Sequence, residues 1–208
     1  SEAIDLALRA LVGPGDEVII PEPSFVAYKG CTTFTGATAK IINLKAEDEF
    51  KLMPDDLRDA ITDKTKVLIL PFPNNPTGAI MTKEELEKIV DVVKDKNIII
   101  LSDEIYGELS YDKKHVSIAE FEEVKDKTLI INGFSKAYAM TGWRLGYACG
   151  NKVLIDAMKK IHQYAIMCSP TTAQYAAIEA LKHGDDSVRE MASEYNRRRR
   201  VLVNGFRK

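Results

Sequence analysis

The sequence predicts an α/β fold, a three-layer α/β/α sandwich around a mostly parallel, mixed sheet, and three observations lead to this fold class. Short apolar runs recur along the chain, with helical segments between them. The runs are rich in Val, Ile and Leu and do not alternate with polar residues, which is typical of strands buried on both faces. No internal repeat, low-complexity stretch or flexible linker divides the 208 residues, so we expect one domain.

Six apolar runs are the predicted strands. In chain order they are Glu17–Ile20, Ala39–Leu44, Lys66–Leu70, Asn97–Leu101, Thr128–Ile131 and Leu145–Cys149.

Helical periodicity marks segments between and after these strands. One apolar stripe follows Thr82 and Glu85, which form a capping box, and a further helix is predicted over Thr172–Lys182, closed by His183 and Gly184. The first stripe comprises Leu86, Ile89, Val90 and Val93, and a second stripe comprises Leu154, Met158, Ile161 and Ala165.

Both ends of the chain look cut. The chain begins inside a helix start at Ser1 and Glu2, and it ends in a helical run opened by a capping box of Ser187 and Glu190. That run continues toward residue 208, although Asn204-Gly205 could weaken or end it. We therefore expect residues 1–208 to be a domain that is incomplete at both ends.

The composition argues against several classes of protein. The 29 basic and 31 acidic residues leave a formal net charge of −2, unlike the strong basic excess of a nucleic-acid binder. No stretch approaches the roughly 20 apolar residues that span a bilayer, and no signal peptide is visible, so we expect no membrane partner. The three cysteines and three histidines show no metal-ligand spacing, which favours a reducing cytoplasm and no metal site.

Chemically useful side chains follow the predicted strands. Ligands of open α/β sheets bind beyond the carboxyl ends of the strands, so these side chains should meet at one edge. Taken singly, each has an ordinary explanation as a surface lysine, a helix cap, a turn residue or a core aromatic. Only the ordered set favours a site, and its members are Phe25, Asn75, Asp103, Tyr106, Ser135 and Lys136, with Arg144 shortly after.

This set suits a pyridine-aldehyde phosphate. The aldehyde needs an amine, which Lys136 could supply, and the ring nitrogen needs a carboxylate such as Asp103 to stay protonated. The ring oxygen beside the aldehyde needs donors, which Asn75 and Tyr106 could provide.

The phosphate and the ring face have candidate partners too. Ser135, Arg144 and the helix start at Ser1 and Glu2 could bind the phosphate. Phe25 could stack on the ring.

Five segments of the chain then carry a family resemblance: PGDEVIIPEPSFVAY, PNNPTGAIMTKEEL, SDEIYGEL, NGFSKAYAMTGWRLGYACG and EYNRRRR. With them the chain resembles the fold-type I, pyridoxal-phosphate-dependent aminotransferases of class I, in the aspartate-aminotransferase-like subgroup. NNPTG, SDEIY and SKAYAMTGWRLG in this order and spacing are highly specific, and the resemblance covers essentially the whole chain.

The resemblance implies pyridoxal 5'-phosphate as cofactor and roles for individual residues. Lys136 corresponds to the lysine that holds the cofactor as an aldimine and then acts as the general base, and Asp103 to the partner of the ring nitrogen. Asn75 and Tyr106 correspond to the groups that bond the phenolic oxygen. Lys136, Asp103 and Tyr106 are thus the implied catalytic residues.

The remaining implied residues bind the phosphate and the ring face. Ser135 and Arg144 correspond to phosphate ligands, and Ser1 and Glu2 match the end of the phosphate-binding turn. Phe25 stands where many members have Trp or Tyr, which is a mild departure.

The implied activity is the transfer of an amino group between an amino acid and a 2-oxo acid by a homodimer. The family's N-terminal arm, C-terminal small domain and substrate-carboxylate arginine have no match here, so the 208 residues alone are expected to be inactive. Two alternatives stay open: a carbon–sulfur lyase or synthase on the same fold, and a cofactor-binding, non-catalytic effector domain of a transcription regulator. A nicotinamide dehydrogenase is disfavoured, because no G-x-G-x-x-G follows a strand.

Overall fold

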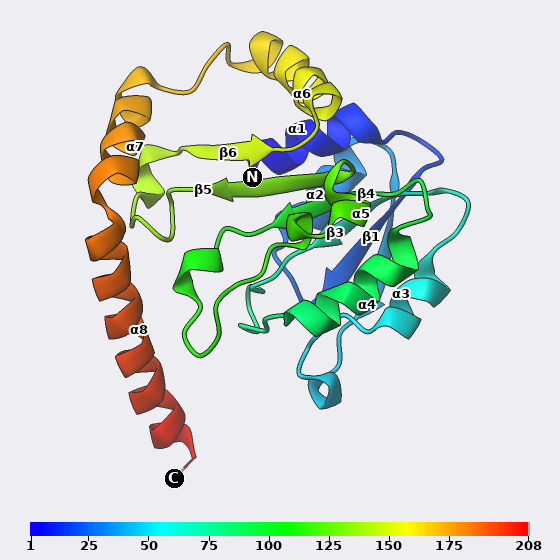
Figure 1. Cartoon of the computed structure of the whole chain (residues 1–208). Coiled ribbons are helices and arrows are strands. Elements are labelled where there is room, and N and C mark those ends of the chain that lie inside the picture. The colour runs from blue at the N-terminus through cyan, green and yellow to red at the C-terminus, as the bar shows by residue number, and fades with distance from the viewer. Residues whose placement is uncertain (208) are drawn as a thin grey trace.

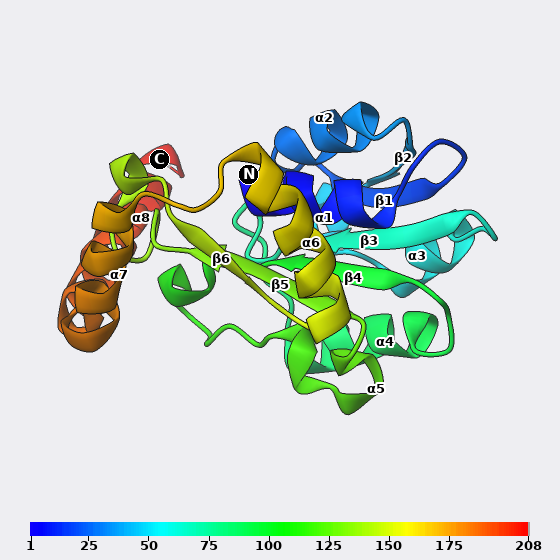
Figure 2. The same cartoon turned by 90° about the horizontal axis from the view of Figure 1, so that it is seen from above.

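Six strands form a single sheet in the computed structural model, which describes residues 1–207 (Figures 1 and 2). Their order is β2-β1-β3-β4-β5-β6; the first five are mutually parallel and β6 runs antiparallel to β5. The sheet is therefore mostly parallel, as predicted. The strands are β1 (Glu17–Glu22), β2 (Thr38–Asn43), β3 (Thr65–Leu70), β4 (Ile99–Asp103), β5 (Thr128–Gly133) and β6 (Gly146–Cys149).

Every predicted strand is present, but some bounds were wrong. The prediction of Asn97–Leu101 stopped two residues short, because β4 continues through Ser102 to Asp103 and pairs there with Ile131 of β5. Polar residues can end this buried strand because their side chains have partners inside the protein.

Helices cover both faces of the sheet, which confirms the three-layer sandwich. One face carries α1 (Glu2–Leu11), α2 (Ala27–Phe34) and α6 (Lys152–Ala165). The other carries α3 (Pro54–Ala60), α4 (Lys83–Val93) and α5 (Glu122–Lys125). The 3-10 segments are η1 (Ala46–Asp48), η2 (Gly107–Leu109), η3 (Ile118–Glu120) and η4 (Thr141–Trp143).

Alternation along each strand divides the core between the two faces. Val18 and Ile20 of β1 pack with α1, α2 and α6, whereas Ile19 packs with α3 and α4. Successive strand residues point to opposite faces, so a strand in the middle of a covered sheet must be apolar throughout.

Helix α4 has the predicted start. Thr82 Oγ1 accepts a hydrogen bond from the Glu85 amide at 3.3 Å, and the Thr82 amide donates to Glu85 Oε2 at 2.8 Å. The predicted stripe of Leu86, Ile89, Val90 and Val93 is buried against the sheet.

The carboxyl end of α4 is held by Lys127, which precedes β5. Its Nζ donates to the carbonyl oxygens of Val93, Lys94 and Lys96 at 2.7, 2.6 and 2.9 Å. These carbonyls lack partners inside the helix, and a cation there also favours the helix dipole.

We expect Lys127→Met to lower the free energy of unfolding by about 1–2 kcal/mol, because it leaves these carbonyls without a charged donor. Lys125→Met is the matched control, since in the described part of the chain Lys125 pairs only with Glu122, on the exposed surface; this substitution should change stability by less than about 0.5 kcal/mol. Urea unfolding of both variants measures the difference. Equal midpoints for the two would contradict this role.

Helix α6 buries part of the predicted stripe: Met158 and Ile161 are confirmed, and Leu154 and Ala165 are wrong. Ile155, Met158 and Ile161 pack on the sheet and α1, whereas Ala165 is exposed at the end of the helix. Asn151 Oδ1 caps the start of the helix by accepting a hydrogen bond from the Val153 amide, and Ile155 rather than Leu154 packs in the core with Met158.

Two further helices follow, α7 (Thr171–His183) and α8 (Asp185–Phe206). The predicted helix ending at His183-Gly184 is confirmed by α7. The predicted capping box of Ser187 and Glu190 is wrong: α8 starts at Asp185, directly after Gly184, and both residues lie inside it. Asn204-Gly205 does not end α8, and the predicted terminus at Lys208 lies outside the described residues.

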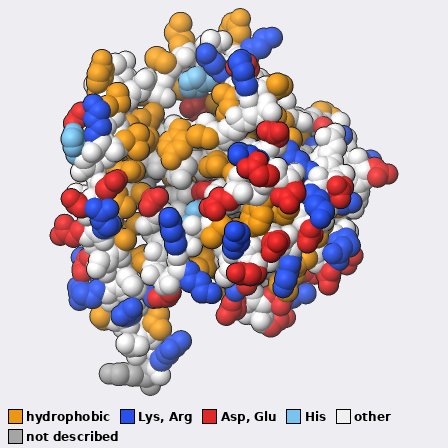
Figure 3. All heavy atoms as spheres, in the orientation of Figure 1, with side chains coloured by type: hydrophobic (Ala, Val, Ile, Leu, Met, Phe, Trp, Pro, Cys, Tyr) orange, Lys and Arg blue, Asp and Glu red, His pale blue; other side chains and the backbone are white. Residues whose placement is uncertain are grey.

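Helix α8 extends away from the sheet (Figure 1). Three arginines of the run on it are paired: Glu194 bonds Arg197 and Arg198, and Arg199 pairs with Asp112. Large apolar side chains are nevertheless exposed on α6, α7, α8 and their connections, and Figure 3 shows hydrophobic groups over this side while charged groups crowd the α3–α4 side. No helix in residues 1–207 is both long and apolar enough to cross a membrane.

Candidate active site

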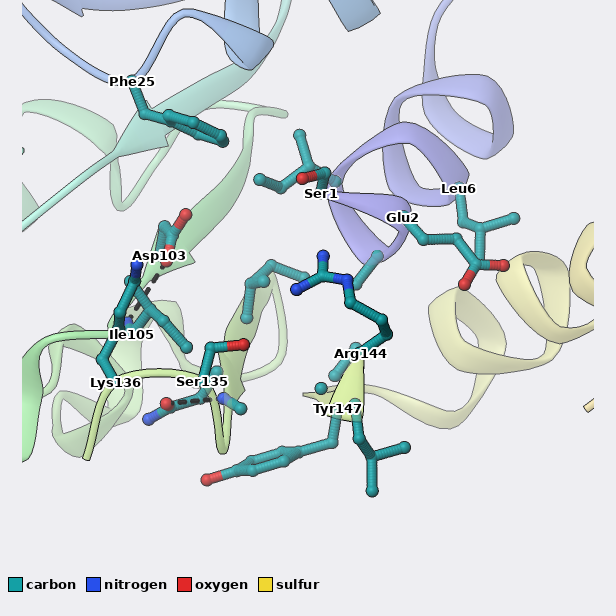
Figure 4. A pocket seen from close by; sticks show the side chains of 18 of the residues that line it. Ser1, Glu2, Leu6, Phe25, Asp103, Ile105, Ser135, Lys136, Arg144 and Tyr147 are labelled. Carbon is teal, nitrogen blue, oxygen red and sulfur yellow. Dashed lines mark hydrogen bonds between the residues drawn. The ribbon is translucent and has the colours of Figure 1, made fainter. Parts of the chain in front are cut away.

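A cavity of about 740 Å³ opens at the carboxyl ends of the parallel strands (Figure 4). This volume lies within the roughly 300–1,000 Å³ of small-molecule sites. All nine sequence-predicted residues border it, and they are Ser1, Glu2, Phe25, Asn75, Asp103, Tyr106, Ser135, Lys136 and Arg144.

The parallel strands explain why these residues meet. Asp103 ends β4, Ser135 and Lys136 follow β5, and Phe25 lies between β1 and α2. Carboxyl ends of adjacent parallel strands lie at one sheet edge, so residues far apart in sequence converge there. Figure 4 shows Phe25, Asp103, Lys136 and Ser135 around one side of the cavity, with Ser1 and Arg144 on the other.

Asp103 is the buried acid of the site, with a relative exposure of 6%. Its Oδ2 accepts a 2.8 Å hydrogen bond from the Tyr28 hydroxyl, and its Oδ1 accepts one from the Ile105 amide at 3.2 Å. Burial raises the pKa of Asp103, and these two hydrogen bonds oppose the rise. Within residues 1–207 the carboxylate forms no ion pair, and it borders the cavity.

Lys136 and Tyr106 lie near each other in the cavity wall. The Lys136 Nζ is 5.8 Å from the centre of the Tyr106 ring. Both side chains are half-buried, so an amine and a phenol are accessible to a molecule in the cavity.

Arg144 and Ser1 give the cavity an anion-binding character. Arg144 adopts a left-handed backbone with φ of 52°, directly after η4, and its Nη1 donates to the Thr141 carbonyl oxygen at 2.7 Å. Ser1 is the N-cap of α1, and its hydroxyl makes no capping bond to that helix. The first amides of α1 and the guanidinium therefore border the same space, which suits a phosphate.

The two asparagines of the Asn-Asn-Pro-Thr-Gly turn have different roles: the first stabilises the turn and the second borders the cavity. Asn74 is buried, and its Oδ1 accepts hydrogen bonds from the Thr77 amide and hydroxyl at 3.2 and 2.9 Å. Gly78 has φ of 74°, which a glycine adopts without strain. Because Asn74 holds the turn, Asn75 borders the cavity with its amide exposed.

Sequence reasoning missed several residues of this site. Tyr28 is the most important, since its hydroxyl bonds Asp103 and its ring packs edge-on to Phe25 with centroids 5.7 Å apart. Its position three residues after Phe25 was the available signal. Glu2 and His162 also pair across the cavity border, with Oε1 2.9 Å from Nδ1, although 160 residues separate them.

Known proteins match this chain along its whole length. The family model for aminotransferase class I and II matches residues 1–208. The chain is 48% identical to YugH of Bacillus subtilis (strain 168), covering 99% of this chain and 53% of that protein. It is 44% identical to an aspartate aminotransferase of Bacillus sp. (strain YM-2), covering 91% of this chain and 49% of that protein.

A solved structure agrees in fold. The aromatic aminotransferase of Pyrococcus horikoshii OT3 superposes with a TM-score of 0.94 at 41% identity, over 98% of this chain and 55% of that one. The chain thus spans about half the length of the proteins it matches. By the family model and these relatives, the chain belongs to the class I and II aminotransferases.

Proposed function

We propose that the full-length protein transfers an amino group between an amino acid and a 2-oxo acid, with pyridoxal 5'-phosphate as cofactor. The buried Asp103 carboxylate, which borders the same cavity as Lys136, is the observation that carries this proposal. A buried carboxylate without an ion-pair partner is unfavourable, and a protonated ring nitrogen would compensate it. Membership of the aminotransferase family supports the same assignment.

The other residues of the cavity fit the rest of the cofactor. Ser135, Arg144 and the start of α1 at Ser1 and Glu2 would hold the phosphate. Phe25 would lie against the ring face.

Asn75 and Tyr106 would donate to the ring oxygen. Because they come from separate segments, after β3 and after β4, they would approach that oxygen from different parts of the sheet edge.

The chain's own residues would carry the proton chemistry. When bound, the cofactor supplies an electron sink for the charge that develops at the substrate α-carbon. Lys136 Nζ would take the proton from that carbon and deliver it to the cofactor's C4′ carbon. Asp103 would keep the ring nitrogen protonated, because its charge is buried and held in place by Tyr28.

We also propose that residues 1–208 are part of a larger homodimeric protein. Tyr164, Met167 and Tyr175 are 88, 81 and 68% exposed on α6, α7 and the segment between them, which is unusual for apolar groups on one side of a molecule. Burial against the rest of the chain or a second copy would remove this surface from water. Sedimentation of the full-length protein should give a dimer mass, and a monomer would contradict the proposal.

A donor screen tests the function. The full-length protein, loaded with pyridoxal phosphate, should convert the cofactor to its amine form with at least one amino acid, seen as a shift of the absorption band. A 2-oxo acid should reverse the shift. If amino acids are instead consumed with release of ammonia or a thiol, the protein is a lyase and the proposal is wrong; no observation in hand favours that reaction or a regulatory domain.

A further inference from the structure

Glu104 directly follows Asp103 but does not border the cavity. It is buried, with a relative exposure of 6%. Its Oε1 accepts hydrogen bonds from the hydroxyls of Ser102 and Ser117 at 3.0 and 2.7 Å, and its Oε2 lies 2.9 Å from His115 Nε2. Burial alone would raise the pKa of Glu104, but the bonds from His115, Ser117 and Ser102 together lower it, so the group is a carboxylate.

These contacts clamp the loop that carries Tyr106. The loop leaves the sheet at Glu104 and ends at Ser117, where η3 begins, so the bond between these two residues closes the loop at its base. The His115 ring packs on Gly107, since a Cβ there would lie 3.0 Å from His115 Cδ2. Tyr106 lies in the sequence between Glu104, whose carboxylate bonds Ser117 and His115, and Gly107, on which the His115 ring packs.

The backbone of the loop depends on the same clamp. The Gly107 amide donates to the Glu104 carbonyl oxygen at 2.9 Å, and the Leu109 amide donates to the Tyr106 carbonyl oxygen at 2.9 Å. A loop with few regular hydrogen bonds opens easily unless side chains hold it. Charge-assisted hydrogen bonds to a buried carboxylate are about twice as strong as neutral ones and can supply that restraint.

We infer that Glu104 is a positioning residue: through Ser117 and His115 it holds the loop so that Tyr106 borders the cavity. This inference rests on the proposed function, in which Tyr106 donates to the cofactor's ring oxygen. Glu104 touches no reacting atom and acts through Tyr106. A purely structural residue would lower stability without changing what the Tyr106 hydroxyl contributes.

A double-mutant cycle on cofactor affinity tests the inference. In the full-length protein, Glu104→Gln should raise the Kd of pyridoxal phosphate about three- to tenfold. In the Tyr106→Phe background, the same substitution should change Kd by less than about twofold, because the hydroxyl it positions is gone. An equal effect in both backgrounds would overturn the inference.

Two serine substitutions distinguish loss of a Glu104 hydrogen bond from a general disturbance of the loop. Ser117→Ala removes a bond to Glu104 and should weaken cofactor binding in the same direction. Ser110→Ala alters the same loop, but the buried Ser110 hydroxyl has no hydrogen-bond partner in residues 1–207, so Kd should stay unchanged. Equal effects of the two substitutions would contradict the clamp.

Hydrogen exchange separates failure of the inference from failure of the proposed function. In the cofactor-free full-length protein, Glu104→Gln should speed exchange of the Gly107 and Leu109 amides about tenfold and leave the amides of β3 unchanged. Unchanged loop exchange would overturn the inference. If the parent protein binds no pyridoxal phosphate, the proposed function fails, and the exchange rates alone decide whether Glu104 holds the loop.

Discussion

Replacing Lys136 with alanine is expected to lower kcat for amino transfer by about 10²- to 10⁴-fold, the contribution of a positioned general base. Lys136 is half-buried at the end of β5, with its Nζ 5.8 Å from the Tyr106 ring centre. The other lysine that borders the cavity within residues 1–207 is Lys159, which lies on α6 rather than after a strand. Steady-state kinetics of the full-length variant measures the loss.

Two controls define the result. Lys152→Ala removes a lysine that is 85% exposed on α6 and should leave kcat within about twofold of the parent. Borohydride reduction of the loaded parent protein, followed by peptide mapping, should place the cofactor on Lys136. A label on Lys159, which lies on α6 and also borders the cavity, would show that the amine has been assigned to the wrong lysine.

Replacing Asp103 with asparagine is expected to lower kcat by about 10²- to 10³-fold while leaving the cofactor-free protein as stable as the parent or more stable. Asparagine keeps the shape of the side chain: its Oδ1 can accept from the Ile105 amide, and its Nδ2 can donate to the Tyr28 oxygen. The substitution therefore removes the charge and little else. The lost charge is the one that would hold the ring nitrogen protonated.

The expected stability of Asp103→Asn relative to the parent depends on pH. Burial raises the pKa of Asp103 above its ordinary value of 3.8, so the folded protein binds a proton that the unfolded chain has released. The stability from this linkage is fully present below pH 3.8 and is lost as the pH rises through the folded pKa. The advantage of Asp103→Asn over the parent should therefore grow across that range and be largest at neutral pH.

Thermal unfolding at several pH values checks the expected stability, and kcat measured in parallel checks the expected loss of activity. Tyr28→Phe is a graded control, because it keeps the carboxylate but removes one hydrogen bond to it, and should lower kcat only about tenfold. Full activity in Asp103→Asn would refute the ring-nitrogen role. A large loss of stability at neutral pH would instead show that the charge has a partner in the folded chain.

The strands and the residues that border the cavity could be predicted because each is indicated by a short stretch of the sequence. Every residue of Val67–Leu70 is apolar, as any strand covered by helices on both faces of a parallel sheet requires. Such a run can be recognised without knowing which strands lie beside it. The residues after the strands could be grouped because the carboxyl ends of parallel strands share one edge, whatever the strand order. Lys136 and Asp103 border one cavity for that reason, and Arg144 joins them because it precedes β6, whose antiparallel direction brings its first residue to the same edge.

Contacts between distant segments could not be predicted, because they depend on strand order and on how each helix is rotated against the sheet. Helix α2 packs on β1 and β2, and β3 lies between β1 and β4 in the sheet, yet the Tyr28 hydroxyl near the start of α2 reaches Asp103 at the end of β4, 75 residues away in sequence. The rotation of α6 brings His162 to Glu2. The sequence around a tyrosine or histidine in a helix does not indicate which distant residue it will contact. Only the packing of the folded chain sets the distance between the two side chains.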